Sequence, residues 1–215
     1  MNFANFDLEN IFDNADYTIE PVKTHDVFEP LRWKETFGKP LHKFLYEAKI
    51  LHHISGVTLA LKRYARAKHI QVVEFAGIYG YTEESEFKRS VLIELLPRLQ
   101  ECYVRRVDVC LDYKKVPNRI LKKLAMSGRE QFKYYNTTYY KTASENKTNP
   151  TLDIKHYNKQ IQANLPVAME RLEFCFKGRY FQNMKLKELD RRFLSKMEKT
   201  ISKFSGVNSK IIPIS

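Results

Sequence analysis

The sequence is poor in the features that define several large classes of protein. It contains three cysteines, at positions 102, 110 and 175, and no CxxC pair, which argues against a disulfide framework and a zinc knuckle. No stretch approaches the roughly 18 apolar residues of a membrane span. The segment from Met1 to Asn14 is acidic and lacks the basic and apolar regions of a signal peptide. These absences predict a cytoplasmic protein that is neither exported nor anchored in a membrane.

Acidic residues are scarce relative to basic ones. Lys and Arg number 37 against 25 Asp and Glu, which gives a formal net charge of +12. A surplus of this size attracts polyanions, so nucleic acid is the first partner to consider. Many basic proteins are merely soluble, however, and charge by itself does not separate the two interpretations.

The domain organisation follows from length and from the positions of proline. A chain of 215 residues, of which 43% are hydrophobic, is sufficient for one domain with a well-filled core. Prolines at 21, 30 and 40 interrupt the first part of the chain. We therefore expect residues 1–40 to form an irregular arm, 41–205 the main domain and 206–215 a C-terminal tail.

Hydrophobic patterning predicts more strands than helices. The polar stretch 142–150 (TASENKTNP) is expected to be a long hairpin loop, and the last helix carries an apolar stripe that is expected to cover the sheet. The predicted fold class is α+β, a mainly antiparallel β-sheet with helices packed on one face. Strands are predicted at 42–50, 56–61, 69–75, 103–113, 131–140, 152–159 and 170–176, and helices at 82–101, 117–126 and about 183–204.

Three of the predicted strands place polar side chains on one face and mostly apolar ones on the other, because side chains alternate along a strand. An arginine and an acid two positions apart can be a simple structural ion pair, which is the plainer interpretation of one such strand. If the three polar faces converge, they bring together a phenol, lysines, arginines and carboxylates. The polar faces consist of Arg106, Asp108, Cys110 and Asp112, of Asp153, Lys155, Tyr157 and Lys159, and of Arg171 and Glu173.

Such a set of groups meets the requirements of phosphodiester transfer to a tyrosine hydroxyl. A phenol has an ordinary pKa near 10, so it needs activation by neighbouring positive charge. The scissile phosphate needs its developing charge stabilised, and hard carboxylates suit Mg²⁺ or Mn²⁺. Each requirement has a candidate residue on one of the three strands.

The same segments carry a specific resemblance. In chain order they are 105–112 (RRVDVCLD), 152–159 (LDIKHYNK) and 169–174 (MERLEF). Together they resemble the replication initiators of rolling-circle plasmids and the gene II proteins of filamentous phages, within the HUH endonuclease superfamily. Including the strand 72–77 that precedes them, the resemblance covers roughly residues 42–181.

The resemblance implies a metal-dependent endonuclease that nicks one strand of a replication origin by tyrosine attack and later rejoins it. Cleavage leaves a 5′-phosphotyrosine and a free 3′-hydroxyl that primes synthesis. The implied partner is origin DNA, single-stranded or supercoiled, with a host helicase and a single-strand-binding protein as further candidates. The implied cofactor is Mg²⁺ or Mn²⁺, and the implied location is the cytoplasm of a bacterial host cell.

Individual roles also follow from the resemblance. The family's Tyr-x-Lys strand motif matches Tyr157 and Lys159, which become the catalytic candidates. Asp108 and Glu173 match positions for metal binding or acid–base support, and Asp112 is a third metal candidate on the same strand face. The basic hairpin tip is either a solvated turn or a contact with DNA. The candidates for DNA contact are Arg106, Lys155, Arg171 and Tyr139, together with Lys62, Arg63 and Arg66 at that tip.

The chain departs from the wider superfamily in its histidines. Many members carry a His-apolar-His metal motif, whereas His52 and His53 are adjacent and point to opposite faces of any strand. We therefore expect a carboxylate-based metal site, with His156 either nearby or an ordinary packed histidine. The missing histidines also argue against a small conjugative relaxase.

Two further alternatives stay open. Tyr135 and Tyr139 have the Tyr-x3-Tyr spacing of initiators that use two catalytic tyrosines on a helix. Asn136 and the threonines beside it favour a strand or turn, so we expect the cluster from Tyr134 to Tyr140 to serve packing or base stacking. The second alternative is a non-catalytic, sequence-specific DNA-binding protein that uses the same basic sheet without chemistry.

Overall fold

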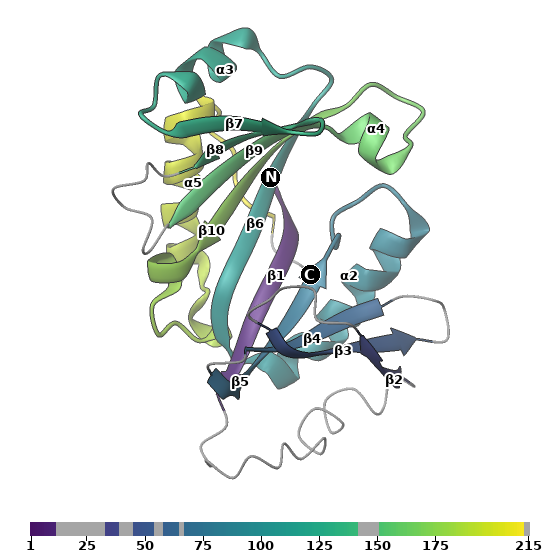
Figure 1. Ribbon diagram of the computed structural model, residues 1–215. Coiled ribbons are helices and arrows are strands. Elements are labelled where there is room, and N and C mark those ends of the chain that lie inside the picture. Colours follow the sequence, from purple (N-terminus) through teal and green to yellow (C-terminus); the bar gives the residue numbers. More distant parts are fainter. Residues whose placement is uncertain (12–32, 39–44, 54–57, 65–66, 142–150, 213–215) are drawn as a thin grey trace.

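The computed structural model contains an antiparallel sheet of ten strands (Figure 1). It describes residues 1–11, 33–38, 45–53, 58–64, 67–141 and 151–212, with side chains for 1–5 and for most residues from 75 onward. The strand order across the sheet is β2-β3-β4-β5-β1-β6-β10-β9-β8-β7. The strands are β1 (Asn2–Ile11), β2 (Trp33–Gly38), β3 (Leu45–His53), β4 (Thr58–Tyr64), β5 (Ala67–Ala76), β6 (Tyr103–Tyr113), β7 (Glu130–Tyr134), β8 (Thr137–Lys141), β9 (Leu152–Asn158) and β10 (Glu170–Lys177).

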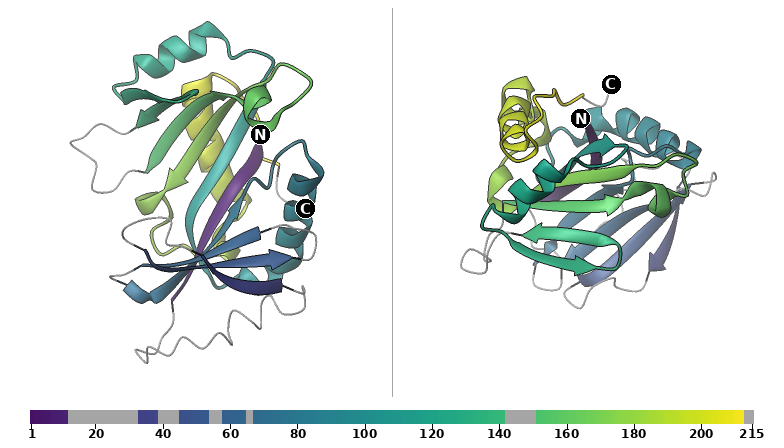
Figure 2. Two further views of the ribbon diagram at one scale, coloured as in Figure 1. Left: turned by 45° about the vertical axis from the view of Figure 1, so that its right-hand side comes forward. Right: turned by 90° about the horizontal axis from the view of Figure 1, so that it is seen from above.

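The helices α2 (Glu83–Leu95), α3 (Asn118–Ala125) and α5 (Arg191–Ser205) pack on the apolar face of the described part of the sheet (Figure 2). One core cluster joins strand residues such as Val109 and Phe174 to Leu92 of α2, Leu124 of α3 and Met197 of α5. The predicted α+β class, with helices packed on one face, is confirmed. The helical segments are α2 (Glu83–Leu95), η2 (Leu96–Leu99), α3 (Asn118–Ala125), α4 (Lys159–Ala163), η4 (Gly178–Phe181), η5 (Leu186–Glu188) and α5 (Arg191–Ser205).

The last helix shows how local sequence sets the ends of an element. Asp190 accepts a hydrogen bond at 2.8 Å from the backbone N–H of Phe193 and so caps the start of α5. Gly206 follows the last turn with φ +68°, a conformation that glycine adopts without strain. The helix predicted over 183–204 therefore begins later, because η5 and the cap at Asp190 occupy its first part.

The first strand corrects the expected irregular arm. Residues 2–11 form β1, which lies between β5 and β6, and residues 33–38 form β2. The prolines that suggested irregular structure stand at 21, 30 and 40, which lie outside the described residues. The prediction of an irregular arm is therefore wrong for residues 2–11 and 33–38, which form strands.

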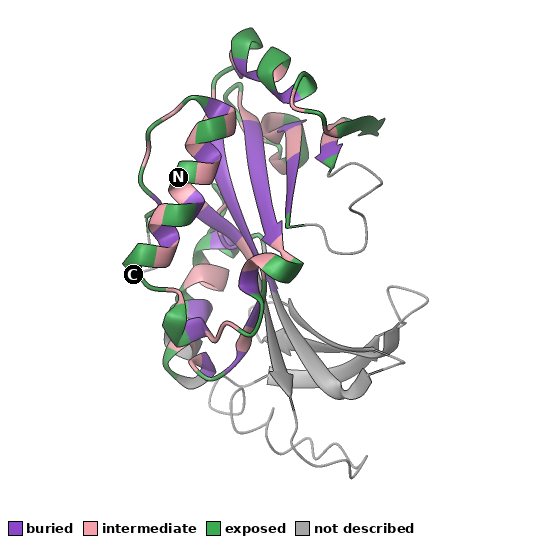
Figure 3. Cartoon of the chain, turned by 90° about the vertical axis from the view of Figure 1, so that its left-hand side faces the viewer, coloured by how far each residue is buried: buried purple, intermediate pink, exposed green. Residues whose placement is uncertain are grey.

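The end of the described chain packs against the start. The N-terminal amine of Met1 donates to the carbonyl of Lys210 at 3.2 Å, and Asn2 forms a parallel bridge with Ile212. Ile211 is buried in the core. The predicted tail is thus part of the packed structure as far as residue 212. Figure 3 shows that the strands in the middle of the sheet are mostly buried, whereas the helices are exposed on their outer sides. Among the described helices, none combines the length and the apolarity needed to cross a membrane.

Two further predicted elements differ in detail. The strand expected over 131–140 is a hairpin, because the chain turns between Tyr134 and Thr137 and pairs β7 with β8. The strand expected over 152–159 ends at Asn158, whose side chain accepts from the N–H of Ile161 at 2.9 Å and starts α4. Lys159 is therefore the first residue of a helix.

Candidate active site

Strand pairing brings the three polar faces together. In the middle of the sheet β10 pairs with β6 on one side and with β9 on the other. One cross-strand row consists of Asp112, Arg171 and Tyr157, and the next of Cys110, Glu173 and Lys155. Because residues opposite each other in register share a face, the convergence expected from alternation is realised.

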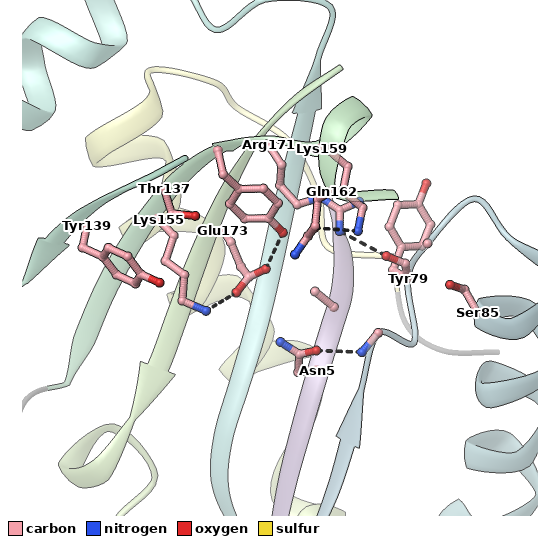
Figure 4. Close-up of a pocket in the computed structure, with 14 residues that line it drawn as sticks. Asn5, Tyr79, Ser85, Thr137, Tyr139, Lys155, Lys159, Gln162, Arg171 and Glu173 are labelled. Atoms are coloured by element: carbon pink, nitrogen blue, oxygen red, sulfur yellow. Dashed lines mark hydrogen bonds and ion pairs between the residues drawn. The ribbon is translucent and has the colours of Figure 1, made fainter. Parts of the chain in front are cut away.

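The centre of the site is Glu173. Its Oε2 accepts a hydrogen bond from the Tyr157 hydroxyl at 2.9 Å, and its Oε1 accepts one from Lys155 Nζ at 2.6 Å. Figure 4 shows Lys155 and Glu173 pointing toward one another. Tyr157 is 8% exposed. Burial and the nearby charge of Glu173 raise the pKa of the Tyr157 phenol well above its usual value, so the phenol is protonated at neutral pH.

A cavity of about 320 Å³ opens beside these groups. Its walls come from β1, β8, β9, β10 and α4, and from the segment between β5 and the start of α2 (Figure 4). The volume lies in the range of ordinary ligand sites. The polar and aromatic lining residues include Asn5, Tyr79, Tyr139, Lys155, Tyr157, Lys159, Gln162, Arg171 and Glu173.

A second carboxylate, Asp108, is fully buried beside the first. It accepts two hydrogen bonds from Arg106, at 2.8 and 2.6 Å, and a third from the amide of Asn5 at 2.6 Å. Burial alone would raise its pKa, but the hydrogen bonds and charge of Arg106 more than offset this and hold the pKa of Asp108 below its usual value. Asp108 is therefore an ionised carboxylate.

The third predicted carboxylate lies in a separate arrangement. Asp112 accepts hydrogen bonds from Arg171 Nε at 2.6 Å and Nη2 at 2.8 Å, and from the Tyr81 hydroxyl at 2.7 Å. Arg171 is 2% exposed and also donates to the carbonyl of Tyr79 at 3.1 Å. This network positions the guanidinium at the cavity wall.

The arrangement of the carboxylates shows whether these residues fit a divalent metal ion. Asp108, Glu173 and Cys175 offer ligand atoms within 4.8 Å of one another, a grouping able to hold an ion. Asp112 is not a member of that group. Burial and the charge of Asp108 raise the pKa of Cys175 well above 9, so the group offers a thiol where Mg²⁺ prefers oxygen ligands.

Lys155 already lies where a cation would bind. Its ammonium is 2.6 Å from Glu173 and 4.0 Å from Asp108, between the two acids. Burial opposes its charge, but the acidic groups around it raise the pKa of Lys155 above its usual value. As arranged, the residues do not fit Mg²⁺ or Mn²⁺, because the ammonium would have to leave first.

Lys159 reaches the cavity from α4. Its Nζ donates to Gln162 Oε1 at 3.0 Å, and both residues line the cavity with Tyr157. Burial and the positive charge of Arg171 lower the pKa of Lys159. A lysine in such surroundings gives up a proton more readily than one in water.

Other predicted residues lie elsewhere. His156 lies on the opposite strand face with Nε2 3.2 Å from Glu170, so it is a packed histidine outside the cavity. Tyr139 lines the cavity, but from a strand, which contradicts a helical Tyr-x3-Tyr pair. Lys62 and Arg63 belong to β4, but their side chains and the whole of Arg66 lie outside the described residues.

Several residues of the site were not predicted from the sequence. Cys175 follows Glu173 by two positions, so strand alternation was sufficient to place it on the polar face. Asn5 lies on β1, where the alternation of Phe6, Asp7, Leu8 and Glu9 was a usable strand signal. Tyr79 and Tyr81 precede α2, and no local pattern connects them with Arg171.

The fold is similar to that of one group of known proteins. Neither models of protein families nor curated proteins give a match. A solved structure of a rolling circle replication initiator protein from Geobacillus stearothermophilus does align, with a TM-score of 0.55 and 16% sequence identity. The alignment covers 94% of this chain and 84% of that one. The chain therefore has the fold of a rolling-circle replication initiator, as its three sequence segments indicated.

Proposed function

We propose that this protein nicks one strand of a DNA replication origin and later rejoins it, with Tyr157 as the nucleophile. The observation that carries the proposal is the 2.9 Å hydrogen bond from the Tyr157 hydroxyl to Glu173 at the wall of the cavity. A protonated phenol is a weak nucleophile, and a carboxylate within hydrogen-bond distance can remove its proton as it attacks. Glu173 thus acts as the general base.

The reaction balances with the groups present. The Tyr157 oxygen attacks the phosphorus, its proton passes to Glu173, and the bond from phosphorus to the 3′-oxygen breaks. The products are a 5′-phosphotyrosine and a 3′-hydroxyl, to which Lys159 supplies the proton. Its lowered pKa favours that transfer. In rejoining, a 3′-hydroxyl gives its proton to Lys159 and attacks the phosphotyrosine, and Tyr157 leaves with the proton returned by Glu173.

Two cations support the transition state. Arg171 is opposite Tyr157 in register, and Lys155 is opposite Glu173 in the neighbouring row, so positive charge lies on both sides of the phenol–carboxylate pair. Fixed charges at such positions stabilise the negative charge that develops on phosphate oxygens. Origin DNA as the partner agrees with the net charge of +12. No step in this mechanism requires a metal ion.

The decisive experiment is mass analysis of the intact protein after incubation with single-stranded DNA from the origin of the replicon that encodes it. We expect a covalent adduct on Tyr157 and none in the Tyr157→Phe variant. The matched control is Tyr140→Phe, which removes a hydroxyl from the core side of the neighbouring strand. This control should form the adduct at the parent rate.

The outcomes separate the alternatives. An adduct retained by Tyr157→Phe, or mapped to Tyr135 or Tyr139, would refute the assignment of the nucleophile. Tight, salt-sensitive DNA binding without any adduct would favour the non-catalytic DNA-binding protein.

A further inference from the structure

The hairpin of β7 and β8 extends the two rows of the site to the edge of the sheet. Opposite Tyr157 in register are Thr137 of β8 and then Tyr134 of β7. Opposite Lys155 are Tyr139 and then Phe132. Residues in one row share a face of the sheet, so these rings lie on the face that carries the cavity.

Two rings of this face are exposed, and a third, Tyr139, is half-buried beneath its contact with Phe132. Phe132 is 38% exposed and Tyr134 is 60% exposed. Tyr139 stacks on Phe132 with centroids 4.9 Å apart and ring planes 4° from parallel. Lys141 Nζ lies 4.8 Å from the Phe132 centroid. The result is an aromatic surface with a cation beside it, continuous with the cavity through Tyr139.

We propose that Phe132, Tyr134 and Tyr139 form a stacking platform for unpaired bases of the strand that is cleaved. The inference rests on the proposed function, and it specifies where the nucleotides next to the scissile phosphate lie. Two strand spacings, about 10 Å, separate β9 from β7. That distance accommodates roughly two nucleotides beyond the phosphate at Tyr157.

The chemistry favours a single strand over a duplex. Bases of a duplex are stacked on one another and offer their faces only at an end, whereas unpaired bases stack on aromatic side chains whatever their sequence. The cation at Lys141 suits the phosphates that accompany those bases. A second copy of the chain pairing with the β7 edge is the competing occupant, and the test below distinguishes it.

The experiment measures the affinity for a labelled mixed-sequence oligonucleotide of about 20 nucleotides, single-stranded and as a duplex. The Tyr157→Phe protein is the parent, so that binding is separated from cleavage. Phe132→Ala and Tyr134→Ala should each weaken single-strand binding about tenfold and leave duplex binding within about twofold. Phe132→Trp, which keeps an aromatic face, should retain the affinity of the parent.

The matched control is Lys133→Ala, between the two rings in sequence but on the opposite face of β7. It should change single-strand affinity less than about threefold, with no preference between the two DNA forms. Thermal unfolding of each variant checks that the hairpin remains folded.

Three results would overturn the platform. The first is that Phe132→Ala and Tyr134→Ala bind single-stranded DNA with the affinity of the parent. The second is ring variants that lose affinity for both DNA forms equally. The third is a parent dimer that the ring variants disrupt, which would assign the edge to a second copy. Since binding is measured without cleavage, the platform can stand even if no adduct on Tyr157 is found, and it can fail while the adduct is present.

Discussion

At the scale of single residues, the site repeats one arrangement twice. Glu173 accepts hydrogen bonds from a lysine and a phenol, and Asp112 accepts them from an arginine and a phenol. In both cases burial and the carboxylate raise the pKa of the tyrosine above its usual value. The two tyrosines differ in position, because Tyr157 lines the cavity together with Lys159, whereas Tyr81 does not line it.

The protonated state of Tyr157 leads to a prediction about Glu173. A raised pKa means that the phenol keeps its proton through the alkaline range, so the rate of adduct formation should not rise between about pH 8 and 10. Glu173→Gln removes the proton acceptor and should slow adduct formation about 10²-fold to 10⁴-fold. Single-turnover kinetics across pH measure both effects. A log-linear rise in the parent rate toward pH 10 would contradict the role given to Glu173.

The position of Lys155 leads to a prediction about metal binding. Lys155→Met removes the ammonium from between Asp108 and Glu173 and leaves two adjacent carboxylates without that charge. We expect the variant to bind Mn²⁺ about tenfold more tightly than the parent, measured by calorimetry. Lys177→Met, which removes a lysine paired with Asp153 at the side of the group, is the control and should change the affinity little. Equal Mn²⁺ affinity in parent and Lys155→Met would show that the ammonium does not compete.

At the scale of elements, the bounds of a strand could be predicted from its own residues, whereas the order of strands in the sheet could not. The alternation of Tyr103 to Tyr113 gave the bounds of β6 correctly, since both faces of that strand have a clear polarity. The placement of β10 between β6 and β9 was not predictable, because pairing over more than fifty residues is set by the whole core. The hairpin turn at Tyr135 was missed because aromatic residues continue through it without a glycine.

That turn gives a prediction about stability. Tyr135 has φ +49° and is 81% exposed, so an aromatic residue occupies a backbone conformation that favours glycine. Tyr135→Gly should raise the free energy of unfolding by about 0.5–1 kcal/mol. Gly128→Ala is the reverse case, with φ +71° and open space around a new Cβ, and should lower it by about 1 kcal/mol. Urea denaturation measures both, and a destabilised Tyr135→Gly would mean that the ring contributes more than its backbone strain removes.

At the scale of the whole molecule, the fold could be predicted from the sequence even though the overall sequence identity to the aligned structure is low. Three short segments in order indicated the initiator fold, although the aligned structure is only 16% identical. In this chain the three segments become strands that pair in the middle of the sheet, and their polar side chains share one face. The contribution of β1 was missed, since its role depends on pairing with β5 and β6, far away in sequence.

The central position of β1 makes the first strand essential to folding. Deletion of residues 1–11 removes the pairing partner of both β5 and β6, together with the buried side chain of Phe3. We expect this variant to lack a cooperative thermal transition, whereas Phe3→Ala should retain one with a loss of about 3 kcal/mol. Circular dichroism during heating measures both, and a cooperative transition in the deletion variant would show that the sheet folds without β1.

The contact between Met1 and Lys210 has a consequence for how the polypeptide is laid out. Although linear in its covalent bonds, the backbone from Met1 to Ile212 is nearly a closed ring in space. A short peptide bridge from Ile212 to Met1 would convert residues 1–212 into a true ring, at little cost in closure entropy because these two residues already hydrogen-bond.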